Sequence, residues 1–244
     1  MSHAPLPPLH IPAALENLHY PQHNLLPVGA LTSDLALDIR TAWPDPAQHD
    51  QVDHLTLIYT SPTGNVHEFP QHMPGPIHFP HRLYLPSQYL QEEGVSKVAF
   101  KVRNHAGATF ESETERFTID LRVPNGGLAG SKPEVDEELS QGDGVTHQYL
   151  QEHDHRVDFF IALYDGQTDG DRIGLSIGGP NEPVLSYKTV TDTTNGTVMS
   201  LEAKYFFDMA DGVHLAYYKL FSRAGKVGPN SKGTFIRIKL GSRS

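Results

Sequence analysis

Hydrophobic and polar residues alternate with a period of two over the C-terminal part of the chain. The clearest run spans 211–225, where β-branched and aromatic residues alternate with polar ones between glycines, and a second run spans 234–240. Alternation of this kind is typical of half-buried β-strands. The same phrase occurs earlier, and because Gly94 and Gly212 open the two copies, they lie 118 positions apart. The sequence therefore predicts two copies of one β unit.

The rest of each copy reads the same way. In the first copy Leu35, Leu37 and Ile39 fall on one face at period two, and 52–59 alternates again. About seven short strands per copy, separated by turn signals and without a long helix, predict an all-β fold. We expect two tandem immunoglobulin-like β-sandwiches with an extended proline-rich N-terminal arm. The expected boundaries are an arm or linker at 1–30, a first sandwich at 31–122, a glycine-rich and acidic linker at 123–144, a second sandwich at 145–240 and a vector-derived tail at 241–244.

The arm and the linker are judged by composition. Prolines recur through 1–30 and deny the backbone its ladder donors, so we expect a flexible linker there rather than an arm docked on the first domain. Residues 123–144 are rich in glycine and acidic side chains, which favours a mobile tether between the two domains.

The two copies are offset by 118 along most of their length. At this offset 157–163 is expected to stand where 39–43 stands in the first copy. The last strand departs from it, because Ile119 matches Ile238, one position further on. A slip of one residue would turn the core face of that strand outward, so we predict one extra residue or a bulge in the last hairpin of the second copy.

Composition excludes several classes of protein. The formal net charge is −10 and the sequence pI is about 5.8, which argues against binding to a phosphate backbone, so nucleic acid is not an expected partner. The chain has no cysteine, which excludes disulfides, thiolate metal sites and a cysteine nucleophile. The N-terminus lacks the pattern of a Sec signal peptide, and no apolar run is long enough for membrane insertion by a helix.

Several phrases of the second copy resemble the bacterial immunoglobulin-like repeats (Big/Ig-like) that occur in tandem in large surface and adhesin-like proteins. They are Tyr164-Asp165-Gly166, the segment 170–175, Asp211-Gly212-Val213 and Ser222-Arg223-Ala224-Gly225. The first copy departs from this pattern where Ala42-Trp43-Pro44-Asp45 replaces the first phrase. The resemblance implies a seven-stranded sandwich that acts as a spacer or binding module, and it brings no shared catalytic residues.

The strongest metal-like pattern is the loop that carries Asp165, Asp169 and Asp171, the last of which coincides with Asp53 of the first copy. Calcium takes several oxygen ligands on a short, glycine-bent loop, so these carboxylates are calcium candidates. The glutamate that closes an EF-hand is missing, and a turn held by Asp and Gly is the alternative. The abundant histidines, including the pair around Asp154, are expected at the surface rather than on zinc.

The two copies differ on the outward face of one strand. The first copy carries Lys97, Lys101 and Arg103 there, but the second carries Leu215, Tyr217 and Phe221. An outward apolar row predicts a contact surface, and cover by the domain's own loops is the alternative.

No nucleophile elbow, phosphate loop or His-Glu-x-x-His pattern is present, so we expect no enzyme and no cofactor beyond the calcium considered above. The predicted function is a spacer and adhesion module of a bacterial surface or secreted protein, with a protein or a cell-surface glycan as partner. A cytoplasmic location stays open. Two alternatives are a carbohydrate-binding module that uses Tyr84, Tyr187 and Tyr217, and an accessory β region of a larger toxin or hydrolase.

Overall fold

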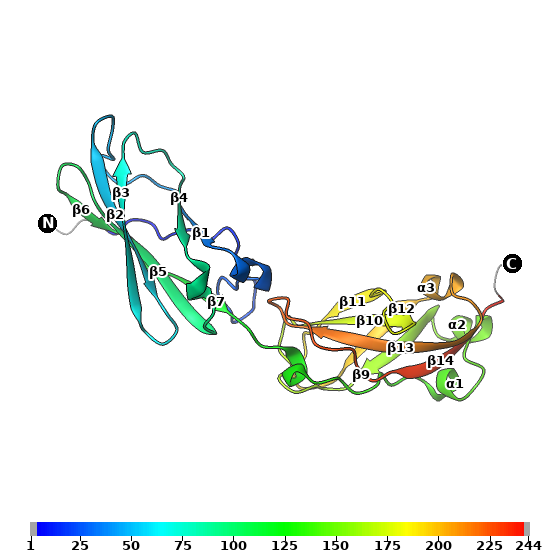
Figure 1. The fold of residues 1–244 in the computed structure, drawn as a ribbon. Helices are drawn as coiled ribbons and strands as arrows, with labels where there is room; N and C mark the ends of the chain where they lie inside the picture. Colours follow the sequence, from blue (N-terminus) through cyan, green and yellow to red (C-terminus); the bar gives the residue numbers. More distant parts are fainter. Residues whose placement is uncertain (1–3, 242–244) are drawn as a thin grey trace. The chain divides into compact units, whose positions relative to one another are not determined.

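The computed structural model describes residues 4–241, so most of the expected vector-derived tail lies outside the described residues. The chain divides into two compact units, Met1–Leu121 and Arg122–Ser244, called domain 1 and domain 2 below (Figure 1). Each unit is built from short β-strands, and each has a hydrophobic core of its own. The predicted all-β fold of two tandem sandwiches is therefore confirmed.

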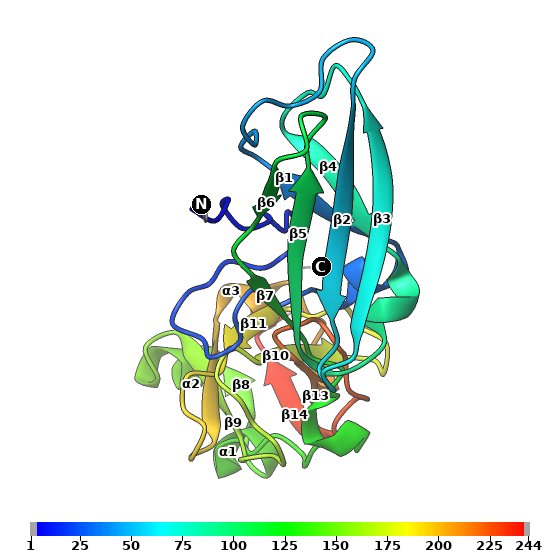
Figure 2. The ribbon, with the colours of Figure 1, turned by 90° about the vertical axis from the view of Figure 1, so that its left-hand side faces the viewer.

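Domain 1 contains two antiparallel sheets. The smaller pairs β1 with β4, and the larger has the order β3-β2-β5-β6, with β7 also paired to β5; Figure 2 shows β3, β2 and β5 side by side. The bounds are β1 Leu35–Ile39, β2 Val52–Thr60, β3 Val66–Pro74, β4 His81–Leu85, β5 Gly94–Arg103, β6 Thr109–Glu111 and β7 Glu115–Ile119, with 3₁₀ turns at Val28–Thr32 and Ser87–Leu90.

Domain 2 repeats this plan with small helices added at its loops. The smaller sheet pairs β9 with β12, and the larger has the order β11-β10-β13-β14-β8. The strands are β8 Val145–Thr146, β9 Arg156–Ile161, β10 Arg172–Gly178, β11 Ser186–Thr189, β12 Thr197–Glu202, β13 Gly212–Phe221 and β14 Thr234–Lys239. The helices are α1 Glu137–Ser140, α2 His147–Glu152 and α3 Lys204–Phe207, and a 3₁₀ turn spans Pro124–Gly127.

Strand periodicity accounts for the cores. In β5 Val98, Phe100 and Val102 are buried, and Lys97 and Lys101 on the other face are exposed, as the alternation predicts. Both sheets of a domain contribute to one cluster, so each core lies between two layers; Leu37 of β1 and Leu57 of β2, for example, share the core of domain 1. Burial of such apolar faces is the main favourable term in folding.

The predicted slip in the last hairpin is confirmed. In domain 1 Gly94 pairs with Ile119, and in domain 2 Gly212 pairs with Ile238, which is one residue further from its partner. The hairpin turns keep the offset of 118: Gly107 N–H donates to the Asn104 carbonyl, and Gly225 N–H to the Ser222 carbonyl.

The extra residue lies late in that hairpin. Gly228 N–H donates to the Leu220 carbonyl, which matches the pairing of Phe110 with Val102 at the offset of 118. Three residues later Ser231 N–H donates to the Tyr218 carbonyl, and its counterpart in domain 1 is Ser112. The insertion therefore falls between Gly228 and Ser231, and it restores the core phase of β14.

The expected alignment of 157–163 with 39–43 was wrong. Backbone bridges join His10 to Asp38 in domain 1 and Glu134 to Phe160 in domain 2, so Phe160 is the counterpart of Asp38, four residues beyond the offset of 118. The reason is the stretch that follows: the chain advances 15 residues from Asp38 to Asp53 (53 − 38) but only 11 from Phe160 to Asp171 (171 − 160), which is four fewer. The alternation of apolar and polar residues within the strands does not show how long the loop between them is.

The supposed arm and the supposed linker are the same element of the repeat. We call 4–26 and 128–146 the leader segments. Leu6 carbonyl accepts from Glu113 N–H, just as Gly130 carbonyl accepts from Lys232 N–H, and the bridges at His10 and Glu134 follow at the same spacing. Further on, each leader pairs in parallel with the last strand of its own domain.

The boundaries at 1–30 and 123–144 are corrected accordingly. Leu9 and Leu26 of the first leader are buried in the core of domain 1, and Leu139 of the second is buried in the core of domain 2. Prolines suit this element because the first leader makes only isolated bridges and the second adds only the two-residue strand β8, so most of the N–H groups are not needed in a ladder. The leader segments, 4–26 and 128–146, are packed parts of their own domains and not flexible tethers.

Candidate functional site

The apolar row predicted on β13 is not an exposed surface. Tyr217 is only 2% exposed, and Leu215 and Phe221 are half-buried. Tyr217 hydroxyl donates to the Glu182 carbonyl at 3.3 Å, and the Phe221 ring meets the Tyr187 ring edge-on at 5.6 Å. The alternative interpretation, cover by the domain's own loops, is the one that the structure supports.

Two segments of domain 2 provide this cover. One is the connection between β10 and β11, which folds back over the outer face of the sheet. The other is the connection between β13 and β14. The two meet where Asn230 Nδ2 donates to the Pro180 carbonyl at 3.0 Å. At the other end of the row Gly233 lies against the Leu215 side chain, so closely that a Cβ there would collide with it. The row is a second apolar layer outside the sheet.

The calcium candidates do not converge. Asp171 is fully buried and is occupied by protein donors: Arg122 Nη2 donates to Oδ1 at 2.7 Å, and Tyr164 hydroxyl donates to Oδ2 at 3.1 Å. Asp165 is exposed and does not join it. Residues 4–241 contain no group of three or more His, Asp or Glu side chains placed to hold a metal ion. Asp171 has a structural role, because its hydrogen bonds hold the surrounding loop together. The alternative of a turn held by Asp and Gly therefore replaces the calcium site.

Asp53, the counterpart of Asp171 in domain 1, is held in the same way by other partners. Asp53 Oδ2 accepts from Trp43 Nε1 at 2.7 Å and from Ala47 N–H at 3.0 Å, and Oδ1 accepts from His105 N–H at 2.8 Å. A fully buried carboxylate needs such donors, because an unpaired charge inside a protein is costly. In domain 2 burial raises the pKa of Tyr164, and the neighbouring Asp171 charge adds to the effect.

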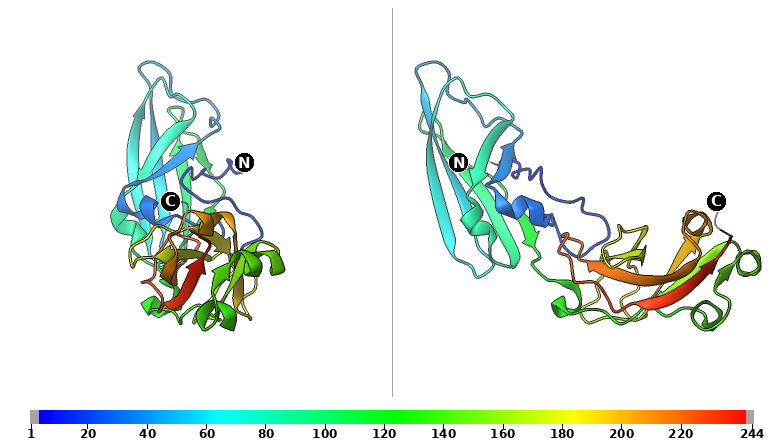
Figure 3. Two further views of the ribbon diagram at one scale, coloured as in Figure 1. Left: turned by 90° about the vertical axis from the view of Figure 1, so that its right-hand side faces the viewer. Right: turned by 45° about the vertical axis from the view of Figure 1, so that its right-hand side comes forward.

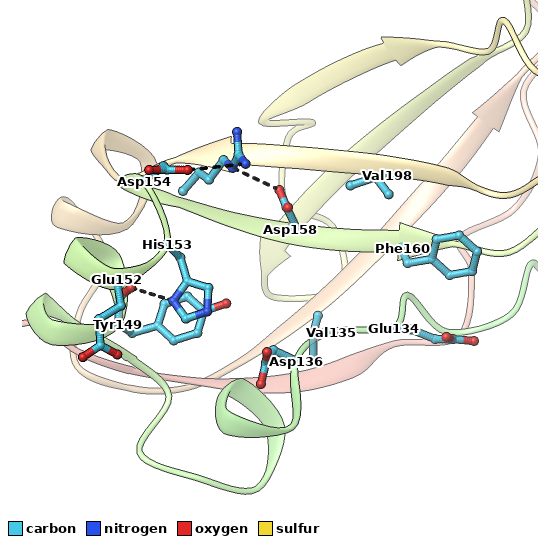
Figure 4. A pocket seen from close by; sticks show the side chains of 11 residues that line it. Glu134, Val135, Asp136, Tyr149, Glu152, His153, Asp154, Asp158, Phe160 and Val198 are labelled. Carbon is cyan, nitrogen blue, oxygen red and sulfur yellow. Dashed lines mark hydrogen bonds and ion pairs between the residues drawn. The ribbon is translucent and has the colours of Figure 1, made fainter.

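The structure places a candidate site elsewhere in domain 2, at a pocket of about 520 Å³ between the leader, α2 and the outer face of the β9–β12 sheet (Figure 4). Its wall is strongly acidic, with an apolar part. The lining residues are Glu134, Val135, Asp136, Tyr149, Glu152, His153, Asp154, Arg156, Asp158, Phe160 and Val198.

Local structure fixes two sides of this pocket. Asp136 caps α1 by accepting from Glu138 N–H at 2.9 Å, and Thr146 caps α2 by accepting from Tyr149 N–H at 3.0 Å. These caps set the direction in which each short helix leaves the leader. The third side is β9, whose outward positions alternate with its core positions and carry Asp158 and Phe160.

Tyr149 forms the floor. Its side chain is buried, with the residue only 3% exposed, and its ring stacks on His153 with ring centroids 3.9 Å apart. Figure 4 shows the ring extending from α2 toward the space between Asp136 and Asp158. Burial first, and then the charges of Asp136 and Asp158, raise the pKa of Tyr149 to about 12, so the hydroxyl keeps its proton at neutral pH.

Carboxylates line the opening on several sides, including Glu134 beside Phe160. Arg156 is the one cation in the lining, and it reaches Asp154 at 3.7 Å and Asp158 at 3.9 Å, against five carboxylates in total. Phe160 and Val198 face each other across the strand pair and are 39% and 43% exposed. A ligand here meets a mainly negative field and, at Phe160 and Val198, an apolar surface.

Sequence reasoning missed this site. The acidic run 134–138 was interpreted as part of a solvated tether, and His153 as a surface histidine. One signal was present: Asp158 and Phe160 lie on the outward phase of a strand with a buried inner phase. The pocket itself depends on the leader folding back beside β9, which no local pattern records.

No family model matches the chain, and no curated protein matches it. Among solved structures, the chain is similar to the fibronectin(III)-like modules of Clostridium thermocellum CbhA, with 8% identity, a TM-score of 0.46 and coverage of 95% of this chain and 93% of that one. It is also similar to the FN1-FN3 domains of chicken CNTN1, with 13% identity, a TM-score of 0.47 and coverage of 85% and 61%.

A third similar structure is a 1.5-MDa bacterial ice-binding adhesin, with 12% identity, a TM-score of 0.40 and coverage of 97% of this chain and 65% of that one. The chain thus spans less than two thirds of the chicken and adhesin chains. All three identities are low, so the likenesses concern the fold and not the site. Among the helices of residues 4–241, none is long and apolar enough to cross a membrane.

Proposed function

We propose that this chain is a non-enzymatic tandem of immunoglobulin-like domains in a surface or secreted protein, where it acts as a load-bearing spacer and carries a protein-interaction site. One observation carries the proposal: in both domains the leader pairs in parallel with the last strand. Leu25 pairs with Thr118 in domain 1, and β8 pairs with β14 in domain 2.

Parallel pairing of the first and last segments matters under tension. When a domain is pulled from its two ends, the leader is drawn backward and the last strand forward, so their hydrogen bonds are loaded in shear and must break together. In domain 1 these include Leu26 N–H to the Thr118 carbonyl at 3.0 Å and Thr118 N–H to the Asn24 carbonyl at 3.3 Å. Such pairing suits a spacer in a tethered protein.

The path of the chain through each domain also suits a spacer. In domain 1 the leader enters beside Ser112, near the Arg103 end of β5, and the chain leaves after Ile119, opposite Gly94 at the other end. Ser112 bonds to Phe100, which is six residues (100 − 94) or about 20 Å along β5 from Gly94, so entry and exit lie toward opposite ends of the sandwich. Domain 2 repeats this path along β13, which lies beside β14 in Figure 3.

The two fully buried carboxylates have structural roles. Asp53 and Asp171 are the acidic residues with no exposed surface in the described chain, and both are saturated by protein donors that hold loops together. A catalytic carboxylate has to reach substrate, and neither of these does. The resemblance to bacterial surface repeats supports an extracellular or cell-surface location.

The proposal is tested by pulling the chain from its termini in a single-molecule force experiment. We expect two unfolding steps, each releasing about 400 Å because about 118 residues extend at roughly 3.5 Å apiece. Gly144→Ala should lower the force of one step, since Gly144 has φ +85° and an added Cβ would collide with the Arg237 carbonyl and disturb the β8–β14 pair.

Gly64→Ala is the matched control. Gly64 has φ +90°, so the backbone strain is similar, but the space around its Cβ is open and it lies in a turn of domain 1. Low unfolding forces in the unaltered chain, or equal effects of the two substitutions on the β8–β14 step, would contradict a load-bearing role.

A carbohydrate-binding function is a second candidate, because a groove of about 290 Å³ in domain 1 combines aromatic rings with amide side chains. His67 and Tyr89 meet there at 4.8 Å between ring centroids, beside Gln88 and Gln91. Of the tyrosines first considered for sugars, Tyr217 is buried and so unsuited to this role. A glycan array with and without chelator tests this candidate, and no binding in either condition rejects it.

A further inference from the structure

We propose that the pocket of domain 2 binds the alkylammonium group of a lysine side chain presented by a partner protein. This inference deepens the interaction role proposed above and rests on it, whereas the load-bearing role does not depend on it. The pocket volume of about 520 Å³ lies within the range of small-ligand sites, which is about 300–1,000 Å³.

The Tyr149 side chain, buried along its ring with its hydroxyl open to the pocket, is the observation that points to a ligand. Tyr149 is 3% exposed and lines the pocket, and among the hydrogen bonds of the described residues its hydroxyl takes part in none. Since the hydroxyl opens onto the pocket and has no partner within the protein, a ligand group that enters the pocket can pair with it. An ammonium group supplies three donors and would use the hydroxyl oxygen as an acceptor.

The carboxylates determine the sign of the ligand charge. Asp136 and Asp158 flank the space toward which Tyr149 points, and both charges raise the pKa of Tyr149. Arg156 offsets part of the negative charge through Asp154 and Asp158, but five carboxylates surround one guanidinium. The remaining negative charge favours a cation and repels an acidic ligand.

The apolar part of the wall selects a cation on an aliphatic chain. Asp158 and Phe160 lie two residues apart on the same face of β9, which separates them by about 7 Å along the strand. The four-carbon stem of lysine spans about 6 Å, so its methylenes fit against Phe160 and Val198 while its ammonium reaches Asp158 and Tyr149. A bare metal ion would leave this apolar surface uncovered.

The test uses the full chain and three probes in an NMR titration: acetyl-Gly-Lys-Gly-amide, the same peptide with norleucine in place of lysine, and cadaverine. We expect the lysine peptide to shift the resonances of Tyr149 and His153, with an affinity that falls as salt rises, and the norleucine peptide to leave them unchanged. Equal responses to the two peptides, or no response to either, would overturn the proposal.

Cadaverine separates the two sources of an alkylammonium group. If it binds more tightly than the lysine peptide, the ligand is a free diamine and a partner protein is rejected as the source. A tighter lysine peptide supports the partner protein, because its flanking backbone then adds contacts.

Tyr149→Phe and Asp158→Asn should each weaken the lysine peptide about tenfold, since each removes one hydrogen-bond partner of a charged group. Asp208→Asn is the matched control, an exposed carboxylate of domain 2 outside the pocket, and should change nothing. Far-UV circular dichroism verifies that each variant is folded. If all three variants bind like the unaltered chain, the pocket is not the site. The force experiment keeps its outcome in either case, so the two proposals fail separately.

Discussion

The same aspartate is buried at the same place in the two domains, but it holds different loops together. In domain 1 Asp53 accepts three N–H donors, and His105 is an ionisable neighbour at 3.5 Å. In domain 2 Asp171 forms a two-bond ion pair with Arg122, the first residue of that domain. In domain 2 the buried aspartate thus holds the first residue of the domain by an ion pair. In domain 1 the corresponding aspartate accepts hydrogen bonds from neutral donors.

The largest effect should come from removing that charge. Asp171→Asn leaves the partly buried Arg122 guanidinium without its counterion, so we expect domain 2 to lose about 3 kcal/mol of unfolding free energy. Asp53→Asn replaces an acceptor oxygen by an amide that faces N–H donors, and we expect domain 1 to lose about 2 kcal/mol.

Urea unfolding of the full chain distinguishes the two losses. Trp43 is the single tryptophan and lies in domain 1, so its fluorescence follows that domain, while far-UV circular dichroism follows both. Asp171→Asn should shift only the circular dichroism transition. A loss no larger than that of Asp53→Asn would show that the ion pair adds nothing beyond neutral hydrogen bonds.

The leaders provide the second comparison, because Leu6 and Gly130 are counterparts. Leu6→Ala removes a buried side chain from the core of domain 1 and should cost about 2 kcal/mol. Gly130→Ala should cost about 1–2 kcal/mol for the opposite reason, since the added Cβ would collide with the Tyr218 hydroxyl and ring.

The same unfolding experiment measures both leader variants. Leu128→Ala, at a largely exposed position of the second leader, is the control and should leave the transition in place. If Leu6→Ala were equally silent, the first leader would be a loose arm after all.

The smallest effect concerns pH and falls on domain 1. Burial lowers the pKa of His81 below its usual 6.5, so between that value and the lower folded-state pKa only the unfolded chain takes up the proton. Stability from this group is complete above pH 6.5 and is lost as pH falls through the folded-state pKa.

His81→Gln should therefore flatten the dependence of the Trp43 unfolding midpoint on pH below 6.5. The substitution leaves part of the slope, because burial and Arg40 lower the pKa of His10 as well. A pH profile unchanged by His81→Gln would show that His81 titrates alike in both states.

Local chemistry explains what could be foreseen about each copy. The alternation in β5 gave its buried face, and the slip at Ile238 predicted the extra residue that the pairing confirms. Both depend on side chains alternating across a strand and on turn residues, and both effects act within a few residues. The coincidence of Asp53 with Asp171 likewise marked a shared structural position before any contact was known.

The sequence by itself thus determined the repeat, its all-β character and the phase of its strands. Only the tertiary structure decided that the leaders belong to the cores, that Tyr217 is covered, and that Tyr149 faces an acidic pocket. These three outcomes depend on segments far apart in sequence packing together, and hydrophobic periodicity records which face of a strand is buried but not what covers the other face.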